Sequence, residues 1–100
     1  MGTNPRVGPK RLAEKLRYIR ASLDLTQEEL LRRLDIEELA TQSKISEFES
    51  GKRVPSLLIV LQYSRLAGVH VEDIIDDDID LPKNIPGPVK YTLSTRRRGR

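Results

Sequence analysis

Four polar side chains, Gln42, Ser43, Lys44 and Glu47, lie close together near the middle of the chain. A glutamine can form a bidentate hydrogen bond with N6 and N7 of adenine, a serine can donate or accept, and a glutamate can accept from N4 of cytosine. A lysine suits a phosphate or a guanine. This chemistry matches the edges of DNA bases, provided that one helix presents these side chains together.

The surrounding residues predict such a helix over 42–50. Thr41 is suited to cap its first turn, and Gly51 is suited to end it. Ile45 and Phe48 are expected to point inward, which leaves the polar residues on the outside. The alternative interpretation is a polar face that is only solvated.

A second short helix is predicted just before it. Thr26 and Glu29 form a capping box, in which each side chain can accept from the backbone N–H of the other residue. Leu30 and Leu34 then recur on one face. Residues 35–40 combine apolar positions at helical spacing with acids that suit a turn, and we interpret them as an extended connector.

Three further helices complete an all-α, five-helix fold. Apolar residues recur at helical spacing from Leu12 to Leu23, residues 56–67 are followed by Gly68 as a stop, and residues 69–77 suit a short last helix. A chain of 100 residues has room for one compact domain of this kind. We place it at residues 10–80, after a flexible arm at 1–9.

The helix at 56–67 is apolar around more than one face. The stripe that we expect to face inward consists of Leu57, Val60, Leu61, Ser64 and Ala67. A monomer would then expose Leu58, Ile59 and Leu66, and we interpret these three residues as candidate contacts of a homodimer. Ordinary scattered surface apolarity is the alternative.

Several classes of function lack the residues they need. The sequence has no cysteine and a single histidine, His70, so thiolate metal sites, zinc sites and a nucleophile with its base are not expected. We therefore expect no cofactor, no metal and no enzyme activity. Neither a long apolar run nor a signal segment is present, which predicts a cytoplasmic protein without membrane insertion.

Charge is arranged in blocks. Residues 72–80 hold six acids and no base, whereas residues 81–100 hold six bases and no acid. Alternate aspartates from Asp76 to Asp80 suggest the start of a calcium loop, but the sixth and twelfth positions are Leu81 and Gly87, so a solvated acidic helix end is favoured. Basic ends suit a polyanion such as nucleic acid, or are simply solvated tails.

Residues 81–100 change in composition. Pro82, Pro86, Gly87 and Pro88 indicate a linker, and Val89, Tyr91 and Leu93 alternate like one short strand, for which loose packing or disorder is the alternative. The chain then ends in four arginines, Arg96, Arg97, Arg98 and Arg100. They are either a disordered solubilising tail or an arm that follows DNA.

Residues 16–75 resemble the phage-repressor (Cro/XRE-type) helix-turn-helix family. The order and spacing of the motif residues carry this resemblance, and they are Arg20, Thr26-Gln27-Glu28-Glu29-Leu30, Leu34, Ile45-Ser46, Glu49, Gly51, Pro55-Ser56-Leu57, Ala67-Gly68-Val69 and Ile74-Ile75. The resemblance implies a compact, lambda-repressor-like DNA-binding domain.

The resemblance also implies a division of roles. The base-facing positions match Gln42, Ser43, Lys44 and Glu47, at the start of the helix that enters the major groove. Arg20 and Glu49 match a largely buried salt bridge between the first and third helices. The residues that match phosphate contacts are Thr26, Gln27, Ser46, Gly51, Lys52 and Arg53.

Two departures from the family pattern concern its turns. The family usually has glycine at the positions of Asp24 and Asp35, where the backbone is left-handed. Leu34 and Ile45 are also about four residues further apart than in the family. The connector must therefore bulge or form an extra turn, and we expect Glu37 and Glu38 to point away from the phosphates.

Together these observations predict a dimeric transcriptional regulator, a repressor in our interpretation, that binds an inverted repeat in double-stranded DNA. One alternative is an antitoxin with the same DNA-binding domain, whose protein partner binds the acidic segment 72–80 or the tail 81–100. Another is a protein–protein adaptor that keeps the helix-turn-helix fold.

Overall fold

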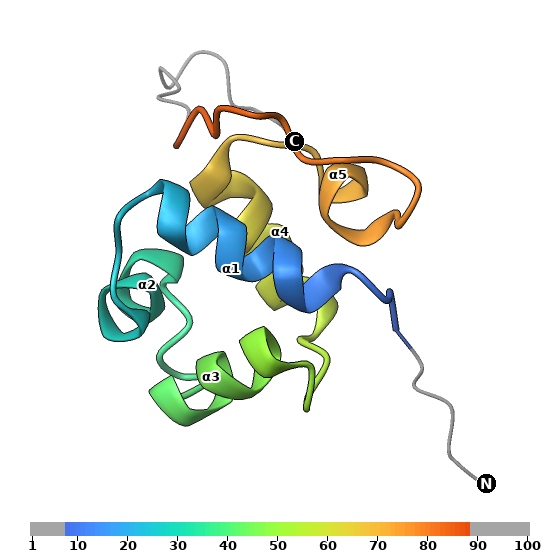
Figure 1. The fold of residues 1–100 in the computed structure, drawn as a ribbon. Coiled ribbons are helices and arrows are strands. Elements are labelled where there is room, and N and C mark those ends of the chain that lie inside the picture. Colours follow the sequence, from blue (N-terminus) through green and yellow to red (C-terminus); the bar gives the residue numbers. More distant parts are fainter. Residues whose placement is uncertain (1–7, 89–100) are drawn as a thin grey trace, which may run out of the picture.

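The computed structural model describes residues 8–88 of the chain, and these residues form an all-helical domain (Figure 1). This confirms the all-α, five-helix prediction. The helices are α1 (Leu12–Ser22), α2 (Gln27–Leu34), α3 (Gln42–Ser50), α4 (Leu57–Ala67) and α5 (Val71–Ile75). The predicted strand around Val89, Tyr91 and Leu93, the four terminal arginines and residues 1–7 lie outside the described residues.

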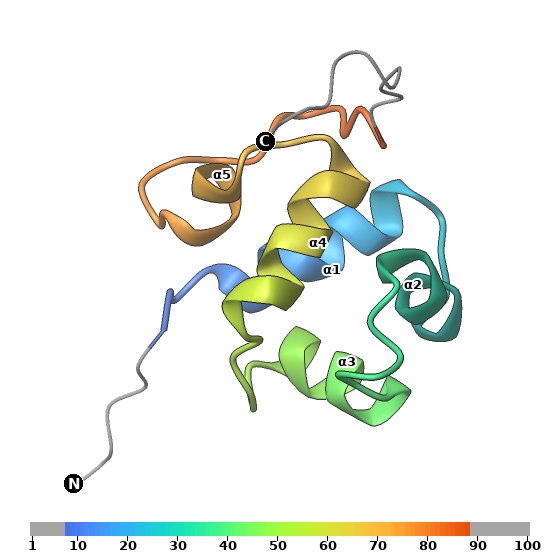
Figure 2. The same ribbon diagram turned by 180° about the vertical axis from the view of Figure 1, so that it is seen from behind.

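Helix α1 is central: it packs against α3 on one side and against α5 on the other. Helix α2 packs against both α3 and α4, and in Figure 2, the view from behind, α4 crosses in front of α1. One apolar core holds these helices together. Its buried side chains are Leu12, Leu16, Ile19, Leu25, Leu30, Leu34, Ile36, Ala40, Ile45, Phe48, Ile59, Val60, Tyr63, Leu66, Ala67 and Ile74.

The ends of the helices follow the sequence signals. Thr26 and Glu29 form the predicted capping box at α2, and the Thr41 side chain accepts from the backbone of the third residue of α3. Asp24 and Asp35 both have φ of 58°, the left-handed conformation that the turns require. Aspartate adopts this conformation more readily than most residues because its short polar side chain bonds locally.

The connector after α2 closes a compact turn. The backbone N–H groups of Leu39 and Ala40 both donate to the carbonyl of Ile36, at 2.7 and 2.9 Å. Ile36 and Ala40 are buried in the core, whereas Leu39 is exposed. The extra residues between α2 and α3 therefore form a hydrogen-bonded turn that is anchored by two apolar side chains.

The inward face of α4 differs from our prediction. Ile59 and Leu66 are only 4% and 7% exposed and belong to the core, so assigning them to a dimer interface was wrong. Leu57, which we expected inside, is 82% exposed, and Leu58 is 61% exposed. The helix begins one residue later than predicted, and its buried face consists of Ile59, Val60, Tyr63, Ser64, Leu66 and Ala67, so Leu57 and Leu58 lie on the outer side of the first turn.

The segment after α5 packs back onto the domain. Leu81 and Ile85 lie against the core, and the Gly87 N–H donates to the carbonyl of Ala67 at 2.9 Å. Figure 1 shows this segment, in orange to red, running across the end of α4 towards the end of α1. Residues 81–88 are thus part of the folded unit.

This packing depends on Gly68. Its φ is 73°, and a Cβ atom there would lie 2.2 Å from the carbonyl oxygen of Gly87. We expect Gly68→Ala to lower the free energy of unfolding by at least about 2 kcal/mol. The added Cβ would disfavour the left-handed backbone conformation and would clash with the Gly87 carbonyl. Urea denaturation measures this. Gly51→Ala is the matched control: φ is 83°, but the nearest contact is 3.9 Å, so a loss of only about 1 kcal/mol is expected.

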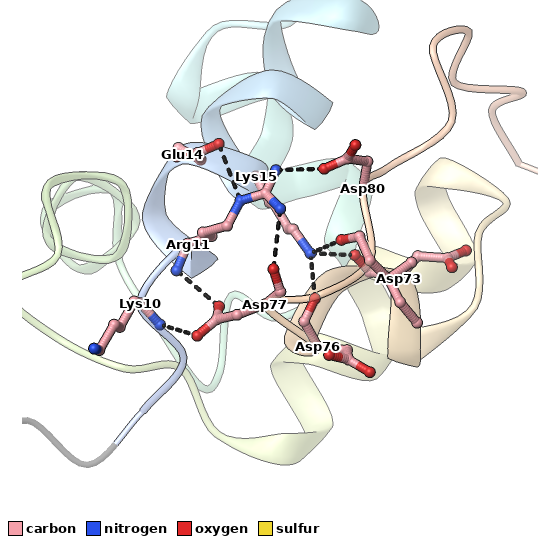
Figure 3. Close-up of polar contacts among 9 residues, drawn as sticks. Lys10, Arg11, Glu14, Lys15, Asp73, Asp76, Asp77 and Asp80 are labelled. Carbon is pink, nitrogen blue, oxygen red and sulfur yellow. Dashed lines mark hydrogen bonds and ion pairs between the residues drawn. The ribbon is translucent and has the colours of Figure 1, made fainter.

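The acidic segment is also docked, at the opposite end of α1 (Figure 3). Lys15 is 2% exposed, and its ammonium group donates to the carbonyls of Asp73, Asp76 and Ile79 at 2.8, 2.8 and 2.6 Å. The last carbonyls of a helix lack partners within the helix, and a cation satisfies them well. Lys15 therefore fastens the end of α5 and the following turn to α1.

Asp77 reinforces this junction from the other side. Its carboxylate accepts from the backbone N–H groups of Arg11 and Lys10, both at 2.9 Å, just before α1 begins. The Arg11 guanidinium also reaches Asp80 at 2.8 Å. The prediction of a solvated acidic helix end was therefore wrong for Asp77, which is half-buried and is held by backbone donors at the start of α1. Asp80 is exposed, as predicted, although its carboxylate pairs with Arg11.

This junction predicts a pH dependence. The backbone N–H donors of Arg11 and Lys10 lower the pKa of Asp77 below its usual 3.8. A lowered folded-state pKa means that the stabilisation is complete above the unfolded-state value and is lost as pH falls through the folded-state value. We expect Asp77→Asn to unfold at lower urea concentration than the wild type at pH 7, and this difference to shrink below about pH 4. A difference that is the same at pH 7 and pH 3 would contradict the assignment.

Candidate nucleic-acid interface

The start of α3 presents a polar surface. Gln42, Ser43 and Ser46 are exposed, and Lys44 is half-buried one turn before the core residue Phe48. Glu47 follows Ser43 by one turn on the same side of the helix. The helix-capping group is Thr41, so the first turn of α3 begins in a fixed orientation. The residues that we predicted to read bases are thus carried by one short, well-anchored helix.

The N-terminus of α2 lies beside α3 (Figure 1). Here Thr26 is engaged as the cap: its hydroxyl accepts from the Glu29 N–H at 3.0 Å, and Glu29 accepts from the Thr26 N–H at 2.9 Å. The hydrogen bond from the Thr26 backbone N–H is the main cause of the lowered pKa of the Glu29 carboxylate. Gln27 is half-buried, and its amide donates to Glu49 at 3.2 Å. Its side chain therefore points from α2 towards α3.

Glu49 is the centre of a polar brace beneath this surface. It is 4% exposed and accepts from Arg20 at 2.8 and 3.0 Å, in a bidentate pair between α1 and α3. This hydrogen bonding raises the pKa of Arg20, and the guanidinium also donates to the carbonyl of Leu25. The brace therefore fixes α3 relative to α1 and to the turn before α2.

Two partners of the brace were missed by reasoning from the sequence. The Gln27 amide shares the Glu49 carboxylate, and the Arg17 guanidinium donates to the Glu49 carbonyl. Arg17 lies three residues before Arg20, on the same side of α1. That spacing was a usable signal, since it places Arg17 one turn before Arg20 on the face of α1 that meets α3.

The loop after α3 is tied to the same helix. The backbone N–H groups of Lys52 and Arg53 both donate to the carbonyl of Glu47, at 2.9 and 3.2 Å. Gly51 has the left-handed conformation that ends α3. The Arg53 guanidinium also pairs with the Glu47 carboxylate at 2.6 Å. A residue predicted to contact phosphate and one predicted to read a base therefore contact each other.

The sequence of this unit is similar to known proteins. A helix-turn-helix family model matches residues 16–74, which contain the brace and both short helices. The chain belongs to the Cro/C1-type helix-turn-helix family. A relative named as an uncharacterized HTH-type transcriptional regulator of Methanocaldococcus jannaschii is 36% identical over 69 residues, which cover 67% of this chain and 98% of the relative. No solved structure matches the chain.

Membership of this helix-turn-helix family makes the protein a DNA-binding transcriptional regulator. The family is defined by DNA binding and is not a class of enzymes. In residues 8–88, no helix is long and apolar enough to cross a membrane. The same residues contain no group of three or more histidine, cysteine or acidic side chains arranged to hold a metal ion.

The connector between α2 and α3 carries two acidic residues inside the helix-turn-helix unit. Glu37 and Glu38 are both exposed in the turn between α2 and α3. Phosphates repel carboxylates, so DNA binding requires that these two side chains face away from the backbone of the duplex. That orientation stays a prediction, and it is specific to the longer connector of this chain.

Proposed function

We propose that the protein regulates transcription by placing α3 in the major groove of an operator. The observation that supports this most is the position of α3: its exposed polar start projects from the domain while its last turn is fixed by the Arg20–Glu49 pair. Gln42 and Ser43 would meet base edges first, and Glu47 would follow one turn later. Occupying the operator would make the protein a repressor.

Phosphate contacts would come from both sides of α3. The N-terminus of α2 offers exposed backbone donors near Thr26 and Gln27, and the loop at 51–53 offers amides with Lys52 and Arg53. Ser46 lies exposed between them on α3. Such contacts would fix the position of the protein along the duplex, whereas the side chains of α3 would determine which base sequence is bound.

The operator would be an inverted repeat bound by two subunits. Leu57 and Leu58 project from the first turn of α4 into solvent, and two such residues are suited to a small contact between subunits. The arginines at 96–98 and 100 would add an arm along the DNA. Sedimentation of the DNA complex checks the stoichiometry: one subunit for each selected duplex would contradict the dimer.

The experiment that tests the function is selection of bound duplexes from a random DNA pool. We expect enrichment of an inverted repeat whose half-sites lie about one helical turn apart. Enrichment of no sequence would contradict sequence-specific binding and would favour the adaptor alternative. Deleting residues 95–100 should lower the salt dependence of binding if these residues form an arm.

A further inference from the structure

The pair formed by Glu47 and Arg53 joins the two parts of the interface. The guanidinium Nε lies 2.6 Å from Glu47 Oε1, and the backbone of the same loop is bonded to the Glu47 carbonyl. The hydrogen bond from Arg53 is the main cause of the lowered pKa of Glu47. In the free protein, Arg53 is therefore engaged by an acid on the reading helix.

This pair is easily exchanged. The Glu47 and Arg53 side chains are 38% and 50% exposed, and exposed ion pairs of this kind contribute little to stability because solvent screens them. A DNA phosphate offers Arg53 a competing partner, since guanidinium groups bind phosphate oxygens well. Once Arg53 leaves, however, Glu47 is an unpaired carboxylate near a polyanion, which opposes binding.

We propose that the Glu47–Arg53 pair makes one phosphate contact conditional on the base that Glu47 meets. This inference deepens the proposed function and depends on it. Where a cytosine amine is present, it replaces Arg53 as the donor to Glu47, and Arg53 moves to a phosphate. At other bases the pair stays intact, and the phosphate contact is not made. Arg53 thus acts as a positioning residue that adds to specificity.

The salt dependence of binding reveals this exchange. Each phosphate contact adds about 0.9 to the slope of log affinity against log salt concentration. We therefore expect the wild-type slope to be steeper by about 0.9 per bound subunit on the best selected duplex than on a scrambled duplex of equal length and composition. Fluorescence anisotropy titrations at several salt concentrations measure both slopes.

Two variants should abolish the difference between the slopes on selected and scrambled DNA, one by raising the lower slope and the other by lowering the higher slope. Glu47→Gln frees Arg53 everywhere, so the slope on scrambled DNA should rise to the value on selected DNA, with affinity for scrambled DNA about two- to fivefold higher. Arg53→Gln removes the contact everywhere, so the slope on selected DNA should fall to the scrambled value. Arg53→Lys should restore part of the difference, since lysine keeps the charge but loses the planar fork.

Lys52→Gln is the matched control, because Lys52 is the neighbouring basic residue on the same loop. It should lower both slopes equally and leave their difference unchanged. A slope difference that persists in Glu47→Gln, or that is absent from the wild type, would overturn the exchange while leaving sequence-specific binding intact. Loss of all preference for the selected duplex in the wild type would instead overturn the proposed function, and the exchange with it.

Discussion

Replacing Lys15 with methionine should lower the free energy of unfolding by about 2 to 4 kcal/mol. The ammonium group is buried and donates to three carbonyls at the end of α5 and in the following turn. Methionine fills a similar volume but cannot donate a hydrogen bond, so the three carbonyls lose their shared donor. The end of α5 and the turn that follows it are then no longer fastened to α1. Urea denaturation followed by circular dichroism gives the change, provided that the slope with urea stays constant.

Lys10→Met is the control for Lys15→Met. Lys10 is exposed, and its backbone rather than its side chain holds Asp77. We expect a change within about 0.5 kcal/mol, as for most surface substitutions. Equal stability of the Lys15→Met variant and the wild type would show that the three hydrogen bonds contribute nothing net, and would remove Lys15 as the anchor of α5.

Glu49→Ala should have an effect at least as large, about 3 to 5 kcal/mol. The substitution removes the acceptor of Arg20 and Gln27 and leaves a guanidinium without its buried partner. It also releases α3 from α1, so affinity for selected DNA should fall even under conditions where the variant is fully folded. Denaturation and DNA titration of the same sample separate the two effects.

The double variant Arg20→Met, Glu49→Leu tests whether the cost comes from the stranded charge. Replacing a buried ion pair by apolar residues of similar volume is often neutral. We therefore expect this double variant to be clearly more stable than Glu49→Ala. If it is equally unstable, the loss comes from packing around α3 and not from an unpaired Arg20.

Reasoning from the sequence works well where the signal is local. The capping box of α2, the Thr41 cap and the two left-handed aspartates each depend on a few adjacent residues, and all are present in the structure. Local backbone chemistry determines these features almost alone. Caps and apolar periodicity together predicted five helices, although the last was expected over 69–77 and spans only Val71–Ile75.

The same reasoning fails where contacts join distant residues. The three acceptors of Lys15 are backbone carbonyls, which leave no trace in the identity of residues 73, 76 and 79. The carboxylate of Asp77 was expected to be solvated because its backbone partners, at residues 10 and 11, are far away in sequence. On α4, an apolar helix offers several possible inward stripes, and only the packed structure selects the one with Ile59 and Leu66.

The pairing of Glu47 with Arg53 lies between these cases. Both residues were assigned to DNA contacts separately, and the turn at Gly51 brings them together. A helix end followed by a left-handed glycine folds the next residues back over the last turns of the helix. The position of Gly51 in the sequence could therefore have indicated the contact between Glu47 and Arg53, whereas their opposite charges alone were not sufficient.

The most direct test of reading by α3 compares selected DNA sequences for the wild type and Gln42→Ala, with Glu72→Ala as a control on α5. We predict that Gln42→Ala relaxes the preference at one position of each half-site, at a cost of about 1 to 3 kcal/mol there, and leaves the other positions intact. Glu72→Ala should select the wild-type sequence. An unchanged sequence preference in Gln42→Ala would contradict the assignment of α3 as the reading helix through this residue.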